Sequence, residues 1–206
     1  MEPDFEISQS RQGEMVDYPP LSPSAGWCAR YLTAVVSGAS EHEAIIRANE
    51  GIRSAKEFAR FRLLDNHGQE TLLPVAVEGG GRKLRGTGIP EGLLLSEHGN
   101  WRKTHLGALE SILGKTPCFR YLERTMAQIY RDLELKTLRD FNFAIFKVII
   151  SFLMKNLRAQ DLAVFYNDER LKTRGKELAR KINPDISVIQ PVAMLGNETL
   201  LGLMAL

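Results

Sequence analysis

The segment LRDFNFAIFKVIISFLM (138–154) constrains the fold more than any other part of the sequence, because it is apolar on nearly every side of a helix. A helix of this kind must be buried in the core. Lys147 and Ser151 interrupt its apolar run, which is well short of the roughly 20 residues that a membrane-spanning helix needs. We therefore expect a buried central helix at about 138–157, opening near Thr137.

Two further helices are predicted before this segment. Residues 100–114 open at Asn100, a suitable N-cap, and repeat apolar side chains at helical spacing. Residues 117–133 show the same periodicity, and Pro117 after Thr116 is typical of the first turn of a helix. The sequence thus predicts three central helices in succession.

A β-hairpin is predicted near residues 59–77. The stretch ARFRLL (59–64) alternates basic and apolar side chains, as a strand with one buried face does. DNHG (65–68) is rich in turn-forming residues, and TLLPVAV (71–77) follows as the second strand. Pro74 has no backbone N–H to donate, which places it at an edge or a bulge.

These elements predict a single α/β domain over residues 18–206, with a mixed α+β arrangement as the alternative. A small mixed sheet would include the hairpin and be covered by the three helices. Residues 1–17 are expected to form an irregular tail. The remaining expected elements are a short helix at 27–36, a strand at 42–48 or alternatively a helix running on from there through SAKEFARFRLL (54–64), a buried strand at 162–166 and an exposed helix or helix pair at 168–182.

Composition restricts the classes of function. A net charge of +2 over 206 residues gives no reason to expect a nucleic acid or an anionic membrane as partner. Cys28 and Cys118 have no metal-binding or disulfide spacing, so no metal site and no cofactor is expected. The N-terminus is acidic and polar and does not resemble a signal peptide. We expect a cytoplasmic protein without a membrane span.

His105 is the leading candidate for catalysis. It lies one helical turn after Trp101 on the apolar stripe of residues 100–114, so both side chains face the same way. A histidine in this position is usually a hydrogen-bonded core residue. It can also serve as a general base, because its ordinary pKa lies near neutrality. The sequence leaves both interpretations open.

Four other side chains are candidates for a site. Arg60 and Arg62 share one face of the first hairpin strand, where they form either a solvated surface or a clamp for phosphate or carboxylate. Asp140 and Asn142 lie in the first turn of the central helix. They either cap that helix and complement its dipole or orient a base. The glycine-rich basic loop GRKLRGTG (81–88) is a connection that could also contact a phosphate.

Several of these segments, taken in order, resemble the WbqC-like protein family. ANEGIRSAKEFARFRLLDNHGQETLLPVAV resembles the middle of the family, and WRKTHLGALESILGKTPCFRYLERTMAQIY resembles its W-x-x-x-H helix and the Pro-Phe-x-Tyr-Tyr helix that follows. LRDFNFAIFKVIISFL is similar to its Leu-x-Asp-x-Asn helix, and NPDISVIQPVAMLGNETL to its C-terminus. The residues at matching positions are Arg60, Trp101, His105, Pro117, Phe119, Tyr121, Asp140 and Asn142.

This resemblance implies a role in the biosynthesis of bacterial surface polysaccharide, O-antigen or capsule. It implies group transfer, in which an acyl or aminoacyl group moves to a nucleotide-linked sugar. His105 would be the base, and Asp140 would orient that base. Trp101 would pack against the base or the acceptor ring. Arg60, Arg62, Asn142 and Tyr121 would bind substrate. The expected ligands are a nucleotide-sugar or an acyl-thioester.

One departure from the family favours a different class of protein. Ala59 stands where the family usually has the Asn of an Asn-Arg pair. The alternative is therefore a non-catalytic binding or scaffold protein that retains the fold. In that case the apolar C-terminus LLGLMAL (200–206) could form the surface of a homodimer.

Overall fold

The computed structural model describes residues 16–52, 54–84, 92–154, 168–196 and 198–206. The predicted strand at 162–166, nearly all of the predicted tail at 1–17 and half of the loop at 81–88 lie outside these residues. The elements, in chain order, are α1 (Ala25–Val36), α2 (Glu41–Asn49), η1 (Ala55–Ala59), β1 (Arg60–Leu64), β2 (Glu70–Pro74), η2 (Gly80–Leu84), α3 (Trp101–Leu113), α4 (Phe119–Arg131), α5 (Leu138–Met154), α7 (Glu169–Ala179), α8 (Ile189–Leu195) and α9 (Glu198–Leu203).

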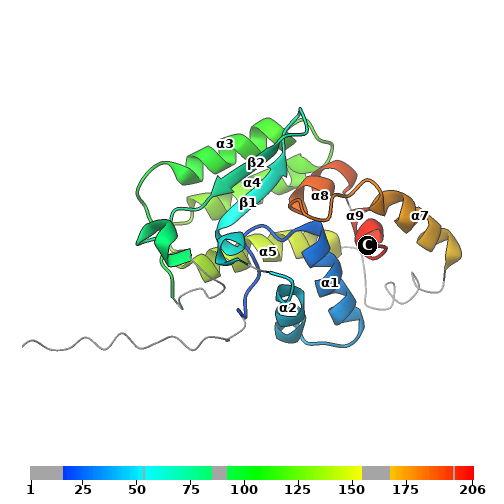
Figure 1. The fold of residues 1–206 in the computed structure, drawn as a ribbon. Helices are drawn as coiled ribbons and strands as arrows, with labels where there is room; N and C mark the ends of the chain where they lie inside the picture. The colour runs from blue at the N-terminus through cyan, green and yellow to red at the C-terminus, as the bar shows by residue number, and fades with distance from the viewer. Residues whose placement is uncertain (1–15, 53, 85–91, 155–167, 197) are drawn as a thin grey trace, which may run out of the picture.

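Helix α5 is the central helix, as its sequence predicts. Figure 1 shows it between the hairpin with α3 and α4 on one side and α1 with α2 on the other. Phe146 packs edge-on against Trp27 and Tyr31 of α1, at centroid distances of 5.6 and 5.1 Å. Near the start of α5, Phe141 packs against Trp101 at 5.5 Å. Helix α5 therefore joins two aromatic clusters in one core.

The hairpin is confirmed, and it is antiparallel with Arg60 opposite Pro74 and Leu64 opposite Glu70. In the described residues the sheet has only these two strands, so it is antiparallel rather than mixed and the chain has an α+β arrangement. The outer edge of β1 is covered by the C-terminal part of the chain. The Gln190 side-chain amide donates to the Leu64 carbonyl oxygen at 3.0 Å and accepts from the Leu64 N–H at 2.9 Å.

The strand expected at 42–48 is wrong, because these residues lie in α2; the helical alternative is right for these residues, but the helix ends at Asn49 and does not run on to Leu64. The Ser40 hydroxyl accepts from the Glu43 N–H, while the Glu43 carboxylate accepts from the Ser40 N–H. This reciprocal capping box stabilises the start of a helix. The apolar residues Ala44, Ile45 and Ala48 then all face the core.

The predicted helices α1, α3 and α7 are confirmed within a few residues of the expected bounds. Helix α4 begins at Phe119 rather than at Pro117. The physical reason is that the Tyr121 N–H donates to the Cys118 carbonyl oxygen at 3.1 Å, three residues back, rather than to the carbonyl oxygen of Pro117. None of the described helices is long and apolar enough to cross a membrane.

Candidate functional site

His105 is a buried side chain with both ring nitrogens engaged. It is 1% exposed, its Nδ1 lies 3.1 Å from the Tyr130 hydroxyl and its Nε2 lies 3.0 Å from the Pro74 carbonyl oxygen. A carbonyl oxygen can only accept, so Nε2 carries the proton and Nδ1 accepts from Tyr130. Burial lowers the His105 pKa from 6.5 to about 4, although the bond to Pro74 opposes this shift. The imidazole is therefore neutral near pH 7.

Trp101 supports the same buried group. Its ring lies 5.3 Å from the His105 ring and its Nε1–H donates to the Ser96 carbonyl oxygen at 2.8 Å. The guanidinium of Arg102 lies over the Trp101 ring, 4.8 Å from the ring centroid. Trp101 and His105 are thus brought together, as their spacing predicts, but inside the core beside Tyr130.

Asn142 is the second buried polar side chain at a candidate position. It is fully buried, and its Nδ2 donates to the Pro19 carbonyl oxygen at 3.0 Å and to the Phe58 carbonyl oxygen at 2.9 Å. Its Oδ1 has no hydrogen-bond partner among the described residues. Asn142 therefore ties the N-terminal segment and η1 to the central helix.

Asp140 lies on the surface, two residues before Asn142. Its carboxylate accepts from the Thr137 hydroxyl at 2.7 Å, and its backbone N–H donates to the Thr137 hydroxyl oxygen at 3.0 Å. These bonds are those of a helix cap, which the sequence offered as one of two interpretations. Tyr121 is 61% exposed on α4, and its hydroxyl accepts from the neighbouring Arg120 at 2.9 Å. Neither side chain contacts His105.

A pocket of about 310 Å³ opens beside the hairpin. It lies where η1 and the start of β1 face the end of β2 and η2, and η1 and η2 are in contact. Of the site residues predicted from the sequence, Arg60 is the one that lines this pocket. The full lining consists of Lys56, Ala59, Arg60, Pro74, Val75, Ala76, Val77, Gly80, Gly81 and Leu84.

The two candidate arginines differ in their surroundings. Arg62 forms ion pairs with Glu57 at 3.4 Å and Glu70 at 3.5 Å. Arg60 lines the pocket together with Lys56, and neither forms an ion pair within the part of the chain that the structure describes. Arg60 therefore fits the anion-binding interpretation and Arg62 fits the solvated-face interpretation.

His105 and Asn142 are each hydrogen-bonded to backbone that lines the pocket or adjoins its lining. Pro74, which receives the His105 hydrogen bond, lines one wall, and Phe58, which receives an Asn142 hydrogen bond, precedes the lining residue Ala59. Hydrogen bonds to buried carbonyl groups fix the backbone that carries them. His105, from the W-x-x-x-H pattern, and Asn142, from the Leu-x-Asp-x-Asn pattern, thus each hold part of the pocket backbone in place.

The sequence did not predict Lys56 or the aliphatic wall formed by Val75 and Val77. Lys56 lies in a single 3-10 turn that is capped by the Ser54 hydroxyl, at 3.3 Å from the Lys56 N–H. Such a turn has no periodicity to recognise. The sequence did contain one signal for it. Lys56 lies four residues before Arg60, so two basic side chains fall in one short segment.

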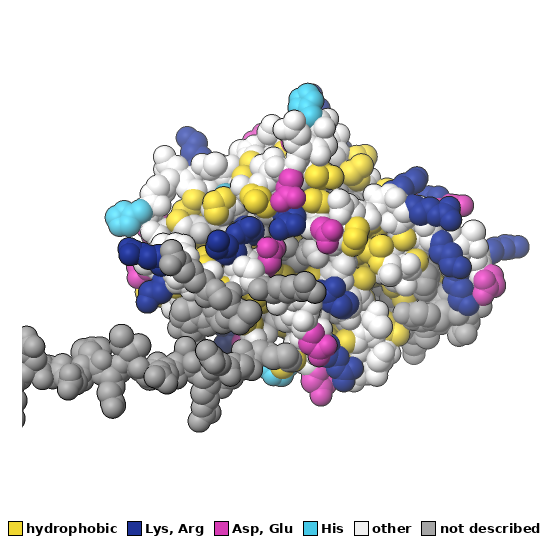
Figure 2. Space-filling view, in the orientation of Figure 1, with side chains coloured by type: hydrophobic (Ala, Val, Ile, Leu, Met, Phe, Trp, Pro, Cys, Tyr) yellow, Lys and Arg dark blue, Asp and Glu magenta, His cyan; other side chains and the backbone are white. Residues whose placement is uncertain are grey.

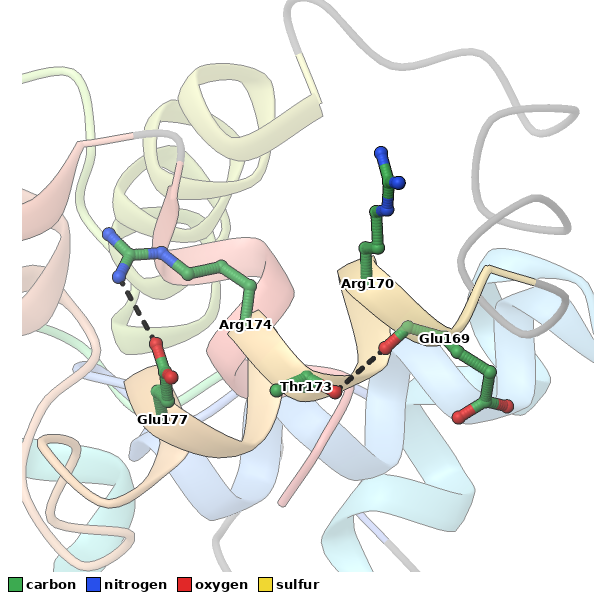
Figure 3. Close-up of a pocket in the computed structure, with 5 residues that line it drawn as sticks. All are labelled: Glu169, Arg170, Thr173, Arg174 and Glu177. Atoms are coloured by element: carbon green, nitrogen blue, oxygen red, sulfur yellow. Dashed lines mark hydrogen bonds and ion pairs between the residues drawn. The ribbon is translucent and has the colours of Figure 1, made fainter.

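A second hollow, of about 420 Å³, lies on α7 at the opposite end of the molecule (Figure 3). All of its lining residues come from this one helix, and Figure 3 shows Arg170 pointing away from both glutamates that line it. Arg174 pairs with Glu177 at 3.4 Å and with Glu198 at 3.1 Å. We interpret it as a solvated helix surface rather than a binding site.

The surface charge agrees with a small local site rather than an extended one. On the face drawn in Figure 2, basic and acidic side chains are interspersed over the described residues. Among those residues, no group of three or more His, Cys, Asp or Glu side chains is arranged to hold a metal ion.

Comparison with known proteins gives one match. The model of the WbqC-like protein family matches residues 53–191, which is well over half of the chain. The matched region contains the hairpin, the pocket and helices α3, α4, α5 and α7, while α1 and α2 precede it. No curated protein and no solved structure matches the chain.

Proposed function

The chain belongs to the WbqC-like protein family, and on this basis we propose that it is a group-transfer protein of bacterial surface-polysaccharide biosynthesis. It would move an acyl or aminoacyl group to an activated sugar, with one anionic substrate held in the pocket beside the hairpin. The observation that carries the proposal is the pair Lys56 and Arg60. Two cations in one concave site are suited to a phosphate or carboxylate group.

In this proposal His105 is a positioning residue. The role of base that its sequence position predicts remains a prediction. The side chain is 1% exposed, and its Nε2 proton is used in the bond to Pro74. A base must reach the proton that it removes. We therefore assign His105 the task of holding the Pro74 carbonyl, and with it one wall of the pocket.

The experiment combines the protein with an acyl donor and a nucleotide-activated sugar, and detects the transferred group on the sugar by mass spectrometry. We expect product with the unmodified protein and at least a tenfold loss with Arg60→Gln, because the anionic substrate loses a charge-assisted hydrogen bond. Arg62→Gln is the matched control and should retain activity, since its guanidinium is paired with Glu57 and Glu70. Equal activity of Arg60→Gln and the unmodified protein would contradict the proposal.

One observation favours a second candidate function, that of a non-catalytic binding protein. None of the described lining residues is a His, Cys, Ser, Asp or Glu, the side chains that most often act as general acid, general base or nucleophile. Ligand binding that depends on Arg60, without any transferred group over a broad set of donors, would support this candidate over the enzyme.

A further inference from the structure

The pocket has a polar part and an aliphatic part, and these parts restrict the class of ligand. The polar part is Lys56 and Arg60, which come from one segment, η1 and the first residue of β1. The aliphatic part comes from the chain after β2 and from η2. There Val75 and Val77 are each 5% exposed and Leu84 is 7% exposed.

The described lining contains no acidic and no aromatic side chain. Ligands rich in hydroxyl groups need several placed polar partners, and nucleobases are commonly held by stacking on aromatic rings. Neither requirement is met by valine, alanine, proline and glycine. The volume of about 310 Å³ is also at the lower end for small-molecule sites, which suits a head group with a few carbons.

We infer that the pocket binds a short aliphatic anion, with its head group on Lys56 and Arg60 and its carbon chain against Val75, Val77 and Leu84. Carboxylic acids and acyl phosphates both have this chemistry. The inference deepens the proposed function and rests on it in one respect. In the proposed transfer reaction, this pocket would bind the acyl donor and not the activated sugar. The activated sugar would then bind outside this pocket.

Gly80 and Gly81 also line the pocket, and Gly81 gives a test that leaves both cations in place. A Cβ atom at Gly81 would meet no other atom within 4 Å, and Gly81 is not in the left-handed region, unlike Gly80 with φ of +68°. A side chain is therefore tolerated at Gly81. Gly81→Val would occupy space at the pocket without straining the backbone.

The first experiment measures dissociation constants by calorimetry for acetate, propanoate, butanoate and pentanoate on the full chain. Each added methylene group should lower the dissociation constant about fourfold, because burial of a methylene contributes about 0.8 kcal/mol. Methyl to pentyl phosphates form a second series, and the series that binds more tightly identifies the head group. Inorganic phosphate measures the head-group contribution alone.

Variants separate the two parts of the pocket. Arg60→Gln should weaken every member of both series by a similar factor of about ten, whereas Gly81→Val should abolish the dependence on chain length and leave inorganic phosphate binding unchanged. Arg62→Gln is the control and should match the unmodified protein. A chain-length series without any trend would overturn the inference, as would a nucleoside-diphosphate sugar whose binding is lost in both Arg60→Gln and Gly81→Val.

These outcomes are distinct from failure of the proposed function. If chain-length-dependent binding is found but no group is transferred to any sugar, the inference about the ligand stands and the protein is a binding protein. If transfer occurs while the nucleotide-sugar occupies this pocket, the proposed function stands and the inference about the donor is wrong.

Discussion

The front and the back of the pocket are built in opposite ways. The front, which is the lining that a ligand would contact, carries two cations, exposed glycines and aliphatic side chains on short segments, and Lys56 is exposed. The back consists of His105 and Asn142, neutral side chains on long helices that are buried and hydrogen-bonded to backbone carbonyl groups. The two regions therefore have different roles. The lining residues determine which ligand binds, while His105 and Asn142 hold the backbone of the pocket in place.

The largest effect should come from the back of the pocket, at Asn142. Replacing Asn142 by Leu removes both donors and leaves the carbonyl groups of Pro19 and Phe58 buried without partners. We expect a loss of about 4 kcal/mol in the free energy of unfolding, measured by urea denaturation. Asp140→Asn, on the same helix turn but exposed, should cost less than about 1 kcal/mol. Similar losses of unfolding free energy in Asn142→Leu and Asp140→Asn would contradict the structural role assigned to Asn142.

The next effect is the pH dependence that His105 confers. Its pKa is about 4 in the folded protein and 6.5 in the unfolded chain, so the unfolded chain binds the proton first as pH falls. The stability is fully present above pH 6.5 and is lost as pH falls towards 4, by about 3 kcal/mol in total. Urea denaturation at pH 7, 5.5 and 4.5 should therefore show a falling difference between the unmodified protein and His105→Gln. A difference that does not change with pH would contradict this account.

The smallest effect on stability should come from the front, and it compares the two arginines. Arg62→Ala removes ion pairs to Glu57 and Glu70, whose side chains are 36% and 45% exposed, so the loss should be at most about 1 kcal/mol. Arg60→Ala should leave the free energy of unfolding within about 0.5 kcal/mol of the unmodified protein, because it breaks no ion pair within the described residues. Its effect should appear in ligand affinity instead, and a large loss of stability would place Arg60 in the scaffold.

The fold was predictable where a local pattern extends over many residues. Helix α5 follows from its apolar composition, and the hairpin follows from alternation on both sides of DNHG. The short apolar run at 42–48 favours a strand, although Ser40 and Glu43 provide a capping signal for helix α2 in the sequence. The start of α4 could not be predicted, because it depends on whether the Tyr121 N–H bonds to Cys118 or to Pro117, and no residue pattern distinguishes these two bonds.

The pocket was predictable only in part. The sequence identified Arg60, and it also identified His105 and Asn142, but it could not tell that the latter two point into the core. Whether a histidine is a base or a structural donor depends on its neighbours in space, here Pro74 and Tyr130, which are 31 and 25 residues away along the chain. The aliphatic wall is assembled from ordinary residues that carry no distinctive pattern, so only the structure shows it.

The side chains that cover the hairpin have a consequence for aggregation. Isolated two-stranded hairpins are marginal in water, and their open edges can pair with other chains. Here the carboxamide of Gln190 takes the place of a peptide group beside Leu64, and the His105 imidazole binds the outward carbonyl of Pro74. If heat or acid detached α3 or α8 before the hairpin melted, these edges would become accessible to a second molecule. Partial unfolding, rather than complete unfolding, would then be the state from which this protein aggregates.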